Sequence, residues 1–578
     1  MEKKDSFQCD VLVVGSGAAG MSAAVTAAHQ GLKVLVVEKR SHFGGTAARS
    51  GGWLWIPGTS LAKAWGHEDS PQAVKAYLQH EGGTSYNEAR VDAFLEHGPE
   101  AVEFFLKNTA VDFEMPLTFP DYHAEAPGAM QGGRSMVAKP FNARQLGDSL
   151  KKLEPPLPEL TVFGMMIGSG KDIRHLMNAT RSWESAVYAF KRLSKHFWET
   201  LTLGRGMLLT NGNALMGRLA KSALDKNIPI WLESPVQELI TENGRVTGAR
   251  VKKEGRLITV YASKGVVLAA GGFSHNVARR AEKYSHTPTG EAHWSPTVES
   301  NTGDTFALFE ALGGAIDNHL PNAAAWAPVS LTRRADGSQG VMPHFIDRAK
   351  PGVIAVTVRG ERFTNEANSY HDYVQAMVKA CEGEKETCSW LICDRYTLRR
   401  YGLGSVAPFP LPIGRHLKSG YLQTGATIEA LAKEIGVDPQ QLKKTVATFN
   451  QNAALGVDPL FGKGSKAYNR YQGDGFHQPN PCVKAINQGP FYAVKIYPGD
   501  IGTYHGIPVD RHCRALNKAG VPIEGLFAVG NDATSIMGGN YPGAGITLGP
   551  ALTFGYAVGK YLAAQEAPEL KDELQKAS

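Results

Sequence analysis

Three glycines and one acidic residue near the start of the chain have the spacing of a dinucleotide site. Gly15, Gly17 and Gly20 form a GxGxxG pattern, and Glu38 follows further along. The first glycine permits a tight turn, the second lets a pyrophosphate approach the backbone, and the third lets a helix pack closely on a strand. The amides at the start of that helix would bind the phosphates, and Glu38 would accept hydrogen bonds from ribose hydroxyls.

A second stretch with possible chemistry is RFTNEANSYHDY, at residues 362–373. It places Tyr370 where an expected strand gives way to an expected helix. A tyrosine there can simply pack, or it can act as a general base. Because the ordinary pKa of tyrosine is about 10, a base would need a neighbouring hydrogen-bond donor or a positive environment that favours the phenolate.

The elements that hold the glycines alternate between strand and helix. Residues 11–14 form an apolar run typical of a buried parallel strand, and the small residues 21–29 predict a helix that Gly31 ends. Residues 34–37 predict a second strand, which ends in Glu38. Strand, glycines, helix, second strand and acid therefore follow one another in the order of a Rossmann-like α/β unit.

Two later segments repeat the pattern of a strand that ends in glycines. Residues 265–273 follow a β-rich meander in which Asn243 and Gly244 predict a hairpin turn. Residues 526–529 predict another strand, followed by a glycine-rich loop and a helix from about residue 546. Both segments are candidates for further contacts with a large cofactor.

The composition limits the possible classes of protein. A chain of 578 residues is expected to form at least two domains, and 43% hydrophobic with 20% charged residues fits a soluble globular protein. The net charge of +6 favours an ordinary solvated surface over an acidic partner, and no basic stripe predicts nucleic-acid binding. The six cysteines form no CxxC pair and match no zinc site, so we expect no metal and reduced thiols in a cytoplasmic protein.

The N-terminus predicts a strand rather than a signal peptide, and no run of 18 apolar residues predicts a membrane-spanning helix. Residues 136–210 are expected to be helical. Within them, apolar residues recur at helical spacing: Trp183, Val187, Phe190, Leu193 and Phe197. We favour an amphipathic helix packed on its own domain. A partner subunit or a membrane surface are the alternatives, so peripheral membrane association stays open, as does the oligomeric state.

The stretch after Glu38 narrows the choice among dinucleotide cofactors. KRSHFGGTAARSGGWLWIPG resembles the second glycine-rich stretch of the FAD-dependent fumarate reductase and succinate dehydrogenase flavoprotein superfamily, which wraps the flavin. Enzymes of that superfamily with covalent FAD carry a histidine directly before the threonine. Gly45 stands there before Thr46, which implies non-covalent FAD. In the superfamily the last helix directs its N-terminus at the flavin's pyrimidine edge, which stabilises the reduced anionic flavin.

The resemblance implies a set of cofactor contacts spread over the chain: Gly15, Gly17, Ala18, Ala19, Gly20, Glu38, Lys39, Gly44, Gly45, Thr46, Ser50, Gly51, Gly52, Val236, Ala270, Gly271, Gly530, Asn531, Gly545, Ile546 and Leu548. It also implies an FAD-binding domain split in sequence. We expect residues 1–304, with a helical insert at about 145–205, and residues 490–578 to form that domain. Residues 305–489 would form an inserted α+β catalytic domain, with the active site between the two.

The position of Tyr370 distinguishes subfamilies. Fumarate reductases place a catalytic arginine there and carry an HPT element that this chain lacks, which argues against a dicarboxylate substrate. A tyrosine there resembles the 3-ketosteroid Δ1-dehydrogenases, whose RxxNExxPY motif provides the general base. Their YPGPG loop matches residues 541–545 except at Ala544, and their PDYY element matches through Tyr122. The resemblance covers nearly the whole chain apart from the insert.

The family's roles carry over to four residues and, less closely, to a fifth. Tyr370 would be the base, and Tyr122 would hydrogen-bond to it. The Tyr541 hydroxyl and the Gly545 N–H would bind the ketone oxygen and stabilise the developing enolate. Phe345, at a spacing one residue longer than in the family, would line the pocket.

The implied reaction is dehydrogenation of a 3-ketosteroid at C1–C2, with an external electron acceptor that reoxidises the flavin. Ala544 and the insert leave open a 3-ketosteroid 4-dehydrogenase or a cyclohexanone-type dehydrogenase. An ene-reductase that runs in the opposite direction is a further alternative. The last alternative is a flavoprotein that serves as a binding subunit or an electron-transfer subunit.

Overall fold

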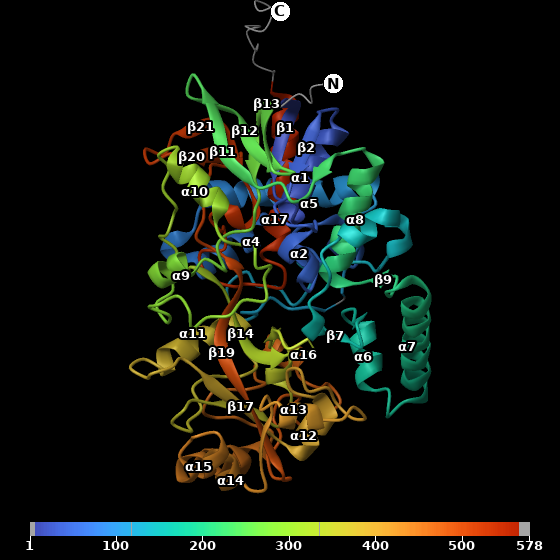
Figure 1. Cartoon of the computed structure of the whole chain (residues 1–578). Helices are drawn as coiled ribbons and strands as arrows, with labels where there is room; N and C mark the ends of the chain where they lie inside the picture. Colours follow the sequence, from blue (N-terminus) through green and yellow to red (C-terminus); the bar gives the residue numbers. More distant parts are fainter. Residues whose placement is uncertain (1–5, 117, 335, 566–578) are drawn as a thin grey trace, which may run out of the picture.

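The structure is a computed structural model that describes residues 6–116, 118–334 and 336–565. An eight-stranded sheet organises the lobe that contains both ends of the described chain (Figure 1). Its strands, in spatial order, are β10 (Ile230–Trp231), β2 (Val34–Val37), β1 (Ser6–Val14), β13 (Arg256–Leu268), β12 (Arg245–Lys253) and β11 (Val236–Glu242), with β21 (Pro522–Ala528) paired to β13 and β20 (Arg514–Leu516) paired to β21.

The predicted strand–helix–strand unit forms the centre of this sheet. β1 runs parallel to β2 and β13, and α1 (Ala18–His29) connects β1 to β2. The expected hairpin is also present, since Asn243 and Gly244 adopt positive φ angles of 50° and 79° between β11 and β12. Strands and helices alternate as expected for an α/β fold, and that prediction is confirmed.

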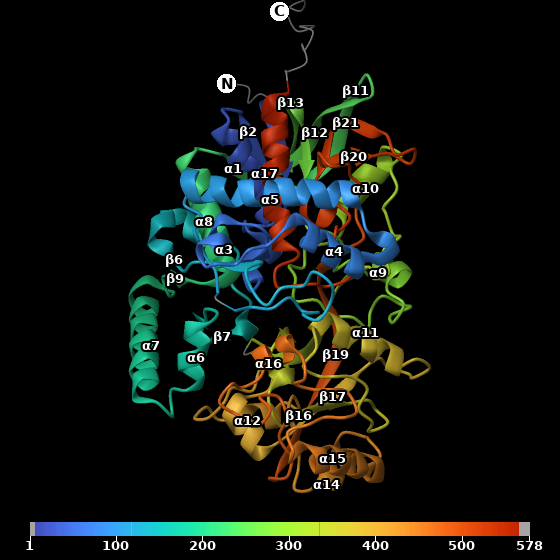
Figure 2. The same ribbon diagram turned by 180° about the vertical axis from the view of Figure 1, so that it is seen from behind.

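Glycines let the last helix lie against the first. α17 (Leu548–Ala564) packs on α1, and a Cβ on Gly555 would come within 2.5 Å of the Ala19 carbonyl oxygen. A Cβ on Gly559 would meet the Thr26 side chain at 2.8 Å. Seen from behind, α5 (Glu88–Asn108) crosses α17 (Figure 2). Segments from both ends of the sequence therefore form one layer that supports the glycine turn.

A second lobe is built on a six-stranded sheet. Its strands are β15 (Gln339–Pro343), β14 (Ala324–Arg333), β19 (Phe491–Thr503), β17 (Ser389–Asp394) and β16 (Val353–Val356) in order, with β18 (Gln423–Gly425) also paired to β19. Its helices are α11 (Tyr370–Ala380), α12 (Arg395–Tyr401), α13 (Gly414–Lys418), α14 (Ile428–Glu434), α15 (Pro439–Ala453) and α16 (Ala467–Gln472). This lobe lies below the first in Figure 1.

The chain returns to the first lobe later than expected. Residue 490 was the predicted boundary, but β19 pairs with β17 through its first half and with β14 through its second. A strand that joins two others in one sheet is part of that sheet, which favours a boundary after Thr503. The domain limits remain a prediction, and the range 490–578 extends beyond the described residues.

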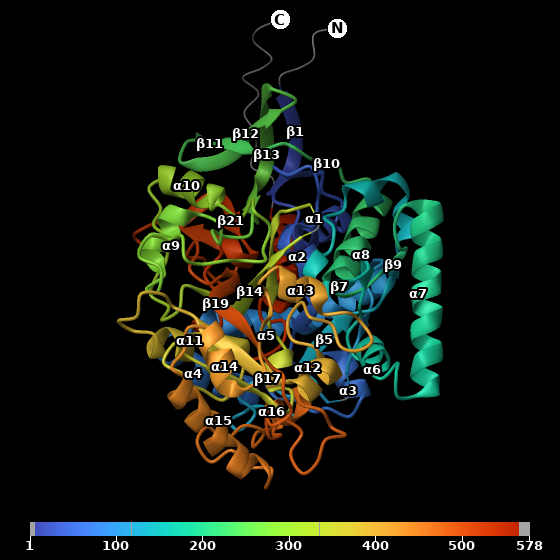
Figure 3. The ribbon, with the colours of Figure 1, turned by 60° about the horizontal axis from the view of Figure 1, so that its bottom comes forward.

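The insert at 145–205 is only partly helical. It begins with 3₁₀ turns at Ala143–Lys152 and a short hairpin of β7 (Thr161–Val162) and β8 (Met165–Met166), and then forms α6 (Lys171–Met177) and α7 (Trp183–Leu203). Figure 3 shows α7 at the edge of the molecule, beyond α6.

The predicted packing of the apolar side of α7 on its own domain is wrong for three of its five residues. Trp183, Phe190 and Phe197 are 84%, 71% and 52% exposed. Smaller and polar side chains face inward instead, because they form specific hydrogen bonds: His196 pairs with the Phe163 carbonyl, and Glu199 accepts from the Met207 N–H. Of the described helices, none has the length and apolar character to cross a membrane.

Candidate active site

One large cavity of about 1330 Å³ connects the two lobes. It runs from the glycine turn after β1, past a group of tyrosines, to the loop 403–411 and the inner sides of α6 and α7. Residues of both lobes line it, which matches the expectation of an active site between two domains.

The glycine turn has the geometry of a phosphate cradle. A Cβ on Gly15 would approach the Ala269 carbonyl oxygen to 2.3 Å, and one on Gly20 would approach the Gly15 carbonyl oxygen to 2.1 Å. At Gly17, in contrast, a Cβ would meet nothing within 4 Å. The first and third glycines are thus required by protein packing, whereas the second faces open space at the start of α1, where a pyrophosphate fits.

The acid at the end of β2 is held in place by its own loop. Glu38 accepts hydrogen bonds from the Ser16 hydroxyl at 2.6 Å and from the Arg40 N–H at 3.0 Å. Ser16 is a site residue that the GxGxxG pattern did not reveal, although it lies between the first two glycines. Its hydrogen bond orients the Glu38 carboxylate at the wall of the cavity.

Most residues expected to contact the cofactor line this cavity: Gly15, Gly17, Ala18, Ala19, Glu38, Lys39, Gly45, Thr46, Ser50, Gly51, Gly52, Val236, Ala270, Gly271, Gly530, Asn531, Gly545 and Leu548. Three do not. Gly20 packs the helix on the turn, Gly44 faces Ala48 and Leu153, and Ile546 lines a small neighbouring hollow. The Lys39 side chain pairs with Asp304 at 2.6 Å.

Asp532 was missed by the sequence analysis. It is fully buried, and its carboxylate accepts from the N–H groups of Ala270 and Gly272 at 2.6 and 3.0 Å. These bonds fix the glycine turn after β13 beside the loop after β21. No motif indicated this role, although Asp532 directly follows Gly530 and Asn531.

The predicted catalytic tyrosines lie together at the other end of the cofactor region. The hydroxyls of Tyr122 and Tyr370 are 3.4 Å apart, and the ring of Tyr541 lies 4.7 Å from that of Tyr370. The ring of Phe345 lies 5.1 Å from that of Tyr370 at the cavity wall. The structure therefore brings together residues that are up to 419 positions apart in the sequence.

Burial, rather than a neighbouring charge, dominates the acidity of these tyrosines. It raises the pKa of Tyr370 well above its ordinary value, and the interactions with Tyr122 and Tyr541 raise it further. The expectation that Tyr122 would favour the phenolate of Tyr370 is not met in the protein alone, since three phenols share one desolvated space. Burial also raises the pKa of Tyr541.

The expected oxygen site combines one hydroxyl and one backbone donor. Gly545 has φ +97°, and a Cβ there would meet the Trp53 carbonyl carbon at 2.3 Å, so glycine is required. Its carbonyl accepts from the Trp55 N–H at 3.1 Å. Within the described residues, no protein acceptor receives the Gly545 N–H. Gly545 and Tyr541 both line the cavity.

Two aromatic residues beside the tyrosines were also missed. Tyr468, on α16, packs against Tyr122 with ring centres 4.3 Å apart and the rings tilted by 36°, and Phe119 lies 6.5 Å from the same ring. Phe119 begins the segment that leads to Tyr122, so its place in the cavity could have been inferred from the PDYY element. Nothing near Tyr468 in the sequence indicated its position.

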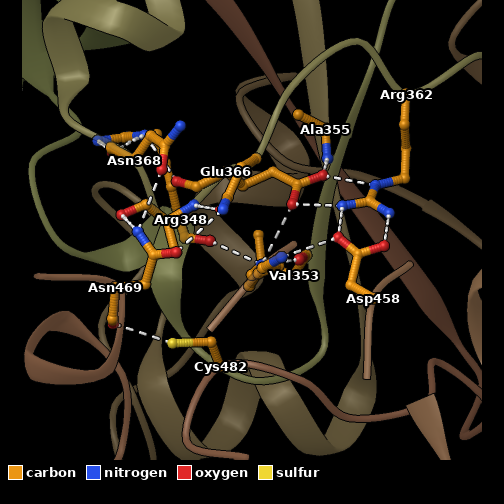
Figure 4. Close-up of polar contacts among 12 residues, drawn as sticks. Arg348, Val353, Ala355, Arg362, Glu366, Asn368, Asp458, Asn469 and Cys482 are labelled. Carbon is orange, nitrogen blue, oxygen red and sulfur yellow. Dashed lines mark hydrogen bonds and ion pairs between the residues drawn. The ribbon is translucent and has the colours of Figure 1, made fainter. Parts of the chain in front are cut away.

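The charged residues of RFTNE form a buried ion network beneath α11 (Figure 4). Arg362 donates two hydrogen bonds to Glu366 at 2.8 Å and two to Asp458 at 2.8 and 2.9 Å. Lys463 lies 3.5 Å from Glu366 and donates to the carbonyls of Arg348 and Val353. All four charges are satisfied by protein, so this network is scaffolding that fixes the chain just before Tyr370.

Arg348 extends this scaffold to the cavity. Its guanidinium donates to the carbonyl oxygens of Glu366 at 2.7 Å and of Asn368 at 3.3 Å, which places it under the turn that leads into α11. A longer contact of 3.5 Å reaches the carbonyl of Phe345. One buried side chain thus connects the backbone of Phe345 with the backbone next to Tyr370.

His123 connects the two segments that carry Tyr122 and Tyr370. Its Nδ1 lies 2.8 Å from Glu81, and its Nε2 lies 3.0 Å from Asp372 on α11. Burial alone would lower the pKa of His123, but hydrogen bonds with Asp372 and Glu81 raise it to about 10. A protonated imidazole between two carboxylates therefore holds the two tyrosine-bearing segments together.

Comparisons with known proteins agree with this geometry. Residues 10–548 match the protein family described as FAD binding domain. The chain is 44% identical to the 4-oxocyclohex-2-ene-1-carboxylate 5-dehydrogenase of Sinomonas cyclohexanicum, over 97% of this chain and 95% of that protein. It is 37% identical to the 3-oxosteroid 1-dehydrogenase of Mycobacterium tuberculosis, over 96% and 98%.

A solved structure shows the same fold throughout. The 3-ketosteroid Δ1-dehydrogenase of Sterolibacterium denitrificans, solved in complex with 1,4-androstadiene-3,17-dione, has 37% identity and a TM-score of 0.89, covering 97% of this chain and all of that one. FAD is thus the cofactor that the glycine cradle holds. The chain is an FAD-dependent dehydrogenase, and it belongs to the family that contains the 3-oxosteroid 1-dehydrogenases.

Proposed function

We propose that the protein removes two hydrogens from neighbouring carbons of a cyclic ketone, with a 3-ketosteroid desaturated at C1–C2 as the substrate that we favour. The observation that carries this proposal is the group of Tyr122, Tyr370 and Tyr541 beside the Gly545 N–H, at the wall of the cavity that also contains the cofactor residues.

Each side chain has a defined part in this reaction. The Tyr541 hydroxyl and the Gly545 N–H donate to the ketone oxygen, which makes the neighbouring C–H more acidic. The Tyr370 phenolate removes the proton from the carbon next to the carbonyl, and Tyr122 donates to the Tyr370 oxygen. FAD, when bound, would supply the acceptor for the hydride that leaves the next carbon. The substrate loses one proton and one hydride, and gains a double bond conjugated with its ketone.

The apolar part of the cavity supports a substrate larger than one ring. Beyond Phe345 the cavity continues along Val406, Phe409 and Leu411 toward Phe190 of α7. A fused-ring body could occupy this extension while its ketone reaches Tyr541. The first test is anaerobic flavin bleaching with a panel of saturated 3-ketosteroids and cyclohexanones, with the products identified by mass spectrometry and NMR. Bleaching by no ketone in the panel would contradict the proposal.

A monocyclic substrate is the second candidate, favoured by the 44% identity to a 4-oxocyclohex-2-ene-1-carboxylate 5-dehydrogenase. The same residues would act on the ketone of a single ring. The product distinguishes the candidates: a 1,4-diene-3-one steroid supports the first, and a desaturated oxocyclohexenecarboxylate supports the second. A 3-ketosteroid 4-dehydrogenase would instead give a C4–C5 double bond.

Two features of the cofactor chemistry also belong to this proposal. Gly45 stands at the position where the covalent enzymes have histidine, so FAD is held non-covalently and acid precipitation should release all of it into solution. An external acceptor then reoxidises the flavin. Steady-state turnover that needs an added acceptor, such as phenazine methosulfate, would support that assignment.

We further propose that α7 docks on an anionic lipid surface. Its exposed apolar side chains outside the cavity are Trp183, Phe197, Trp198 and Leu201. The exposed Lys191 and Lys195 on the same helix would attract acidic headgroups. Cosedimentation with phosphatidylglycerol vesicles, but not with phosphatidylcholine vesicles, is expected. Loss of binding in Trp183→Ser/Trp198→Ser would support the site, whereas self-association without lipid would assign the face to a second copy.

A further inference from the structure

Two cations and one hydroxyl stand along the cavity wall beyond Phe345. Lys350, Arg400 and Ser405 all line the cavity and belong to the second lobe. None of them has a part in the reaction described above. They differ from the apolar residues of the lining, because each has a polar group that is not fully hydrogen-bonded or ion-paired by the described residues.

Lys350 is a cation without a carboxylate partner. Its Nζ donates to the carbonyl oxygens of Gln472 at 2.7 Å and Gly473 at 2.8 Å. The ion pairs among the described residues include none for Lys350. Burial lowers its pKa to about 8. An ammonium group has three donors, and carbonyl oxygens do not neutralise its charge, so one donor and a full positive charge remain for a ligand.

Arg400 and Ser405 contribute donors without partners. The Arg400 guanidinium donates to Met177 O and Asn178 Oδ1 at 2.9 and 3.1 Å, but its buried Nε has no partner among the described residues. The buried Ser405 Oγ has none either. Buried polar atoms are nearly always hydrogen-bonded in folded proteins. Two such atoms on one cavity wall therefore indicate a ligand that supplies acceptors.

The acids on this wall already have partners. Asp347 is bonded to His344 Nδ1 at 2.6 Å and accepts from the Gly404 N–H at 2.9 Å. Asp474 accepts from the Tyr401 hydroxyl at 2.7 Å and lies 3.5 Å from Arg400. Among the described residues, Lys350 therefore forms no ion pair with a counter-ion of its own. A ligand with a negative charge would supply it.

A short series of contacts links this wall to the tyrosines. Gln472, whose carbonyl accepts from Lys350, donates through its side chain to the Tyr468 hydroxyl at 3.1 Å. The ring of Tyr468 in turn packs against that of Tyr122, with centres 4.3 Å apart. Two residues thus separate the free ammonium from the tyrosine that hydrogen-bonds to Tyr370.

We propose that Lys350, supported by the Arg400 Nε and the Ser405 hydroxyl, binds a carboxylate on the ketone substrate, at the end of the molecule away from the carbonyl. This inference rests on the second candidate of the proposed function, the monocyclic keto acid, and assigns the residues that would bind its carboxylate. A neutral ketone would leave the Lys350 charge uncompensated in a desolvated wall. A keto acid would pair that charge while its carbonyl lies against Tyr541 and Gly545.

The test compares a keto acid with its neutral ester. The probes are 4-oxocyclohexanecarboxylate and methyl 4-oxocyclohexanecarboxylate, assayed by kcat and KM with an artificial acceptor. We expect wild type to prefer the acid in kcat/KM by about tenfold or more, as for a charged hydrogen bond. Lys350→Met should remove this preference mainly through KM for the acid, whereas Lys350→Arg should keep most of it. Ser405→Ala should reduce it a few-fold.

A structural role for Lys350 predicts a different pattern. If its bonds to Gln472 and Gly473 only fasten that turn, Lys350→Met will lower turnover of acid and ester equally, which would overturn the proposal. Lys433, on the distant α14, is the matched control, and Lys433→Met should leave the acid-to-ester ratio unchanged. An equal rate for acid and ester in wild type would also overturn the proposal. Absence of turnover with acid, ester and ketosteroids alike would contradict the proposed function instead.

Discussion

Residues 362–373 belong to two buried polar clusters, one built of paired charges and the other of neutral tyrosine hydroxyls. Below α11, Arg362 and Glu366 belong to a network in which every charge is met by an opposite charge or a carbonyl (Figure 4). At the start of α11, Tyr370 lies among other phenols and apolar rings, and burial raises its pKa. In the first cluster every charged group is paired within the protein. In the second, the buried phenols stay protonated at neutral pH.

This difference separates support from chemistry. A saturated ion network has no free donor or acceptor to offer a ligand, but it strongly restricts the backbone that it holds. A desolvated hydroxyl without a strong partner can exchange a proton with a substrate. The motif residues around Tyr370 are therefore expected to affect mainly stability, and the tyrosines mainly rate. Single substitutions can test this division.

Tyr370→Phe should produce the largest effect on rate. We expect a loss of about 10³- to 10⁴-fold in kcat, because proton transfer by a positioned base is worth up to that much. FAD content and the midpoint of thermal unfolding should stay near wild type, since the ring remains packed on Tyr541 and Phe345. Near-normal turnover in this variant would remove Tyr370 from the role of base.

The raised pKa of Tyr370 gives that prediction a pH dependence. The phenol must lose its proton before it can act, so kcat/KM should rise with pH through the alkaline range. Tyr373, on the same helix but bonded to Ser389, serves as a control. Tyr373→Phe should leave the shape of the pH profile unchanged. A flat profile in wild type would show that the base has a pKa well below the ordinary value of tyrosine.

Arg362→Met should mainly reduce stability. Removing one partner of a buried ion pair costs about 3–5 kcal/mol, because Glu366 and Asp458 would keep uncompensated charges. Chemical denaturation at neutral pH should show this loss as a lower midpoint. The residual folded enzyme should keep a KM for ketone near that of wild type. A stable Arg362→Met variant with lost catalysis would contradict the division between the two clusters.

A feature of the fold or of the site could be predicted from the sequence when it depends only on residues that are close together in the chain. The cradle of Gly15, Gly17 and Gly20 was predictable because turn, close approach and helix packing depend on a few adjacent residues. Tyr122 and Tyr541 were assigned only through their resemblance to family motifs, since nothing local indicates that distant tyrosines meet. Asp458 and Lys463 were missed because they lie far from Arg362 in sequence and belong to no motif.

The errors have physical reasons as well. The side chain of Asp532 was not predicted because its partners are backbone N–H groups, which have no sequence signature. The pairing of β19 with β14 and β17 was not predicted, because an apolar strand has the same sequence pattern in either sheet. The exposed apolar side of α7 has the same residue spacing as a helix side that packs on a domain. The spacing alone does not tell whether another element covers that side.

Tyr541→Phe should have a smaller effect than Tyr370→Phe. One of two donors to the ketone oxygen would be lost, and the loss of one such donor lowers rate by about 10²-fold. Because the Gly545 N–H remains, we expect residual activity and a raised KM, measured with the same ketone. Tyr504→Phe is a suitable control, since its hydroxyl donates to the Asn540 carbonyl instead. Unchanged kinetics in Tyr541→Phe would exclude that hydroxyl from the oxygen site.

His123→Asn tests the contact between the two regions and should have the smallest effect. The pKa of His123 is raised in the folded state to about 10, so its stabilising charge is fully present below the unfolded value of about 6.5. That stabilisation should fade as pH rises from about 6.5 through about 10. Wild type should therefore lose unfolding free energy across this window, and His123→Asn should lose less of it.

The same substitution should slow turnover only a few-fold, because Tyr122 and Tyr370 keep their own packing while the Glu81–Asp372 connection is lost. Thermal unfolding of both proteins at pH 6 and pH 9.5 measures the difference. Parallel decreases in the two proteins would mean that His123 does not hold its proton between the carboxylates. In that case the alignment of the tyrosines would depend on the ion network beneath α11 and on ring packing alone.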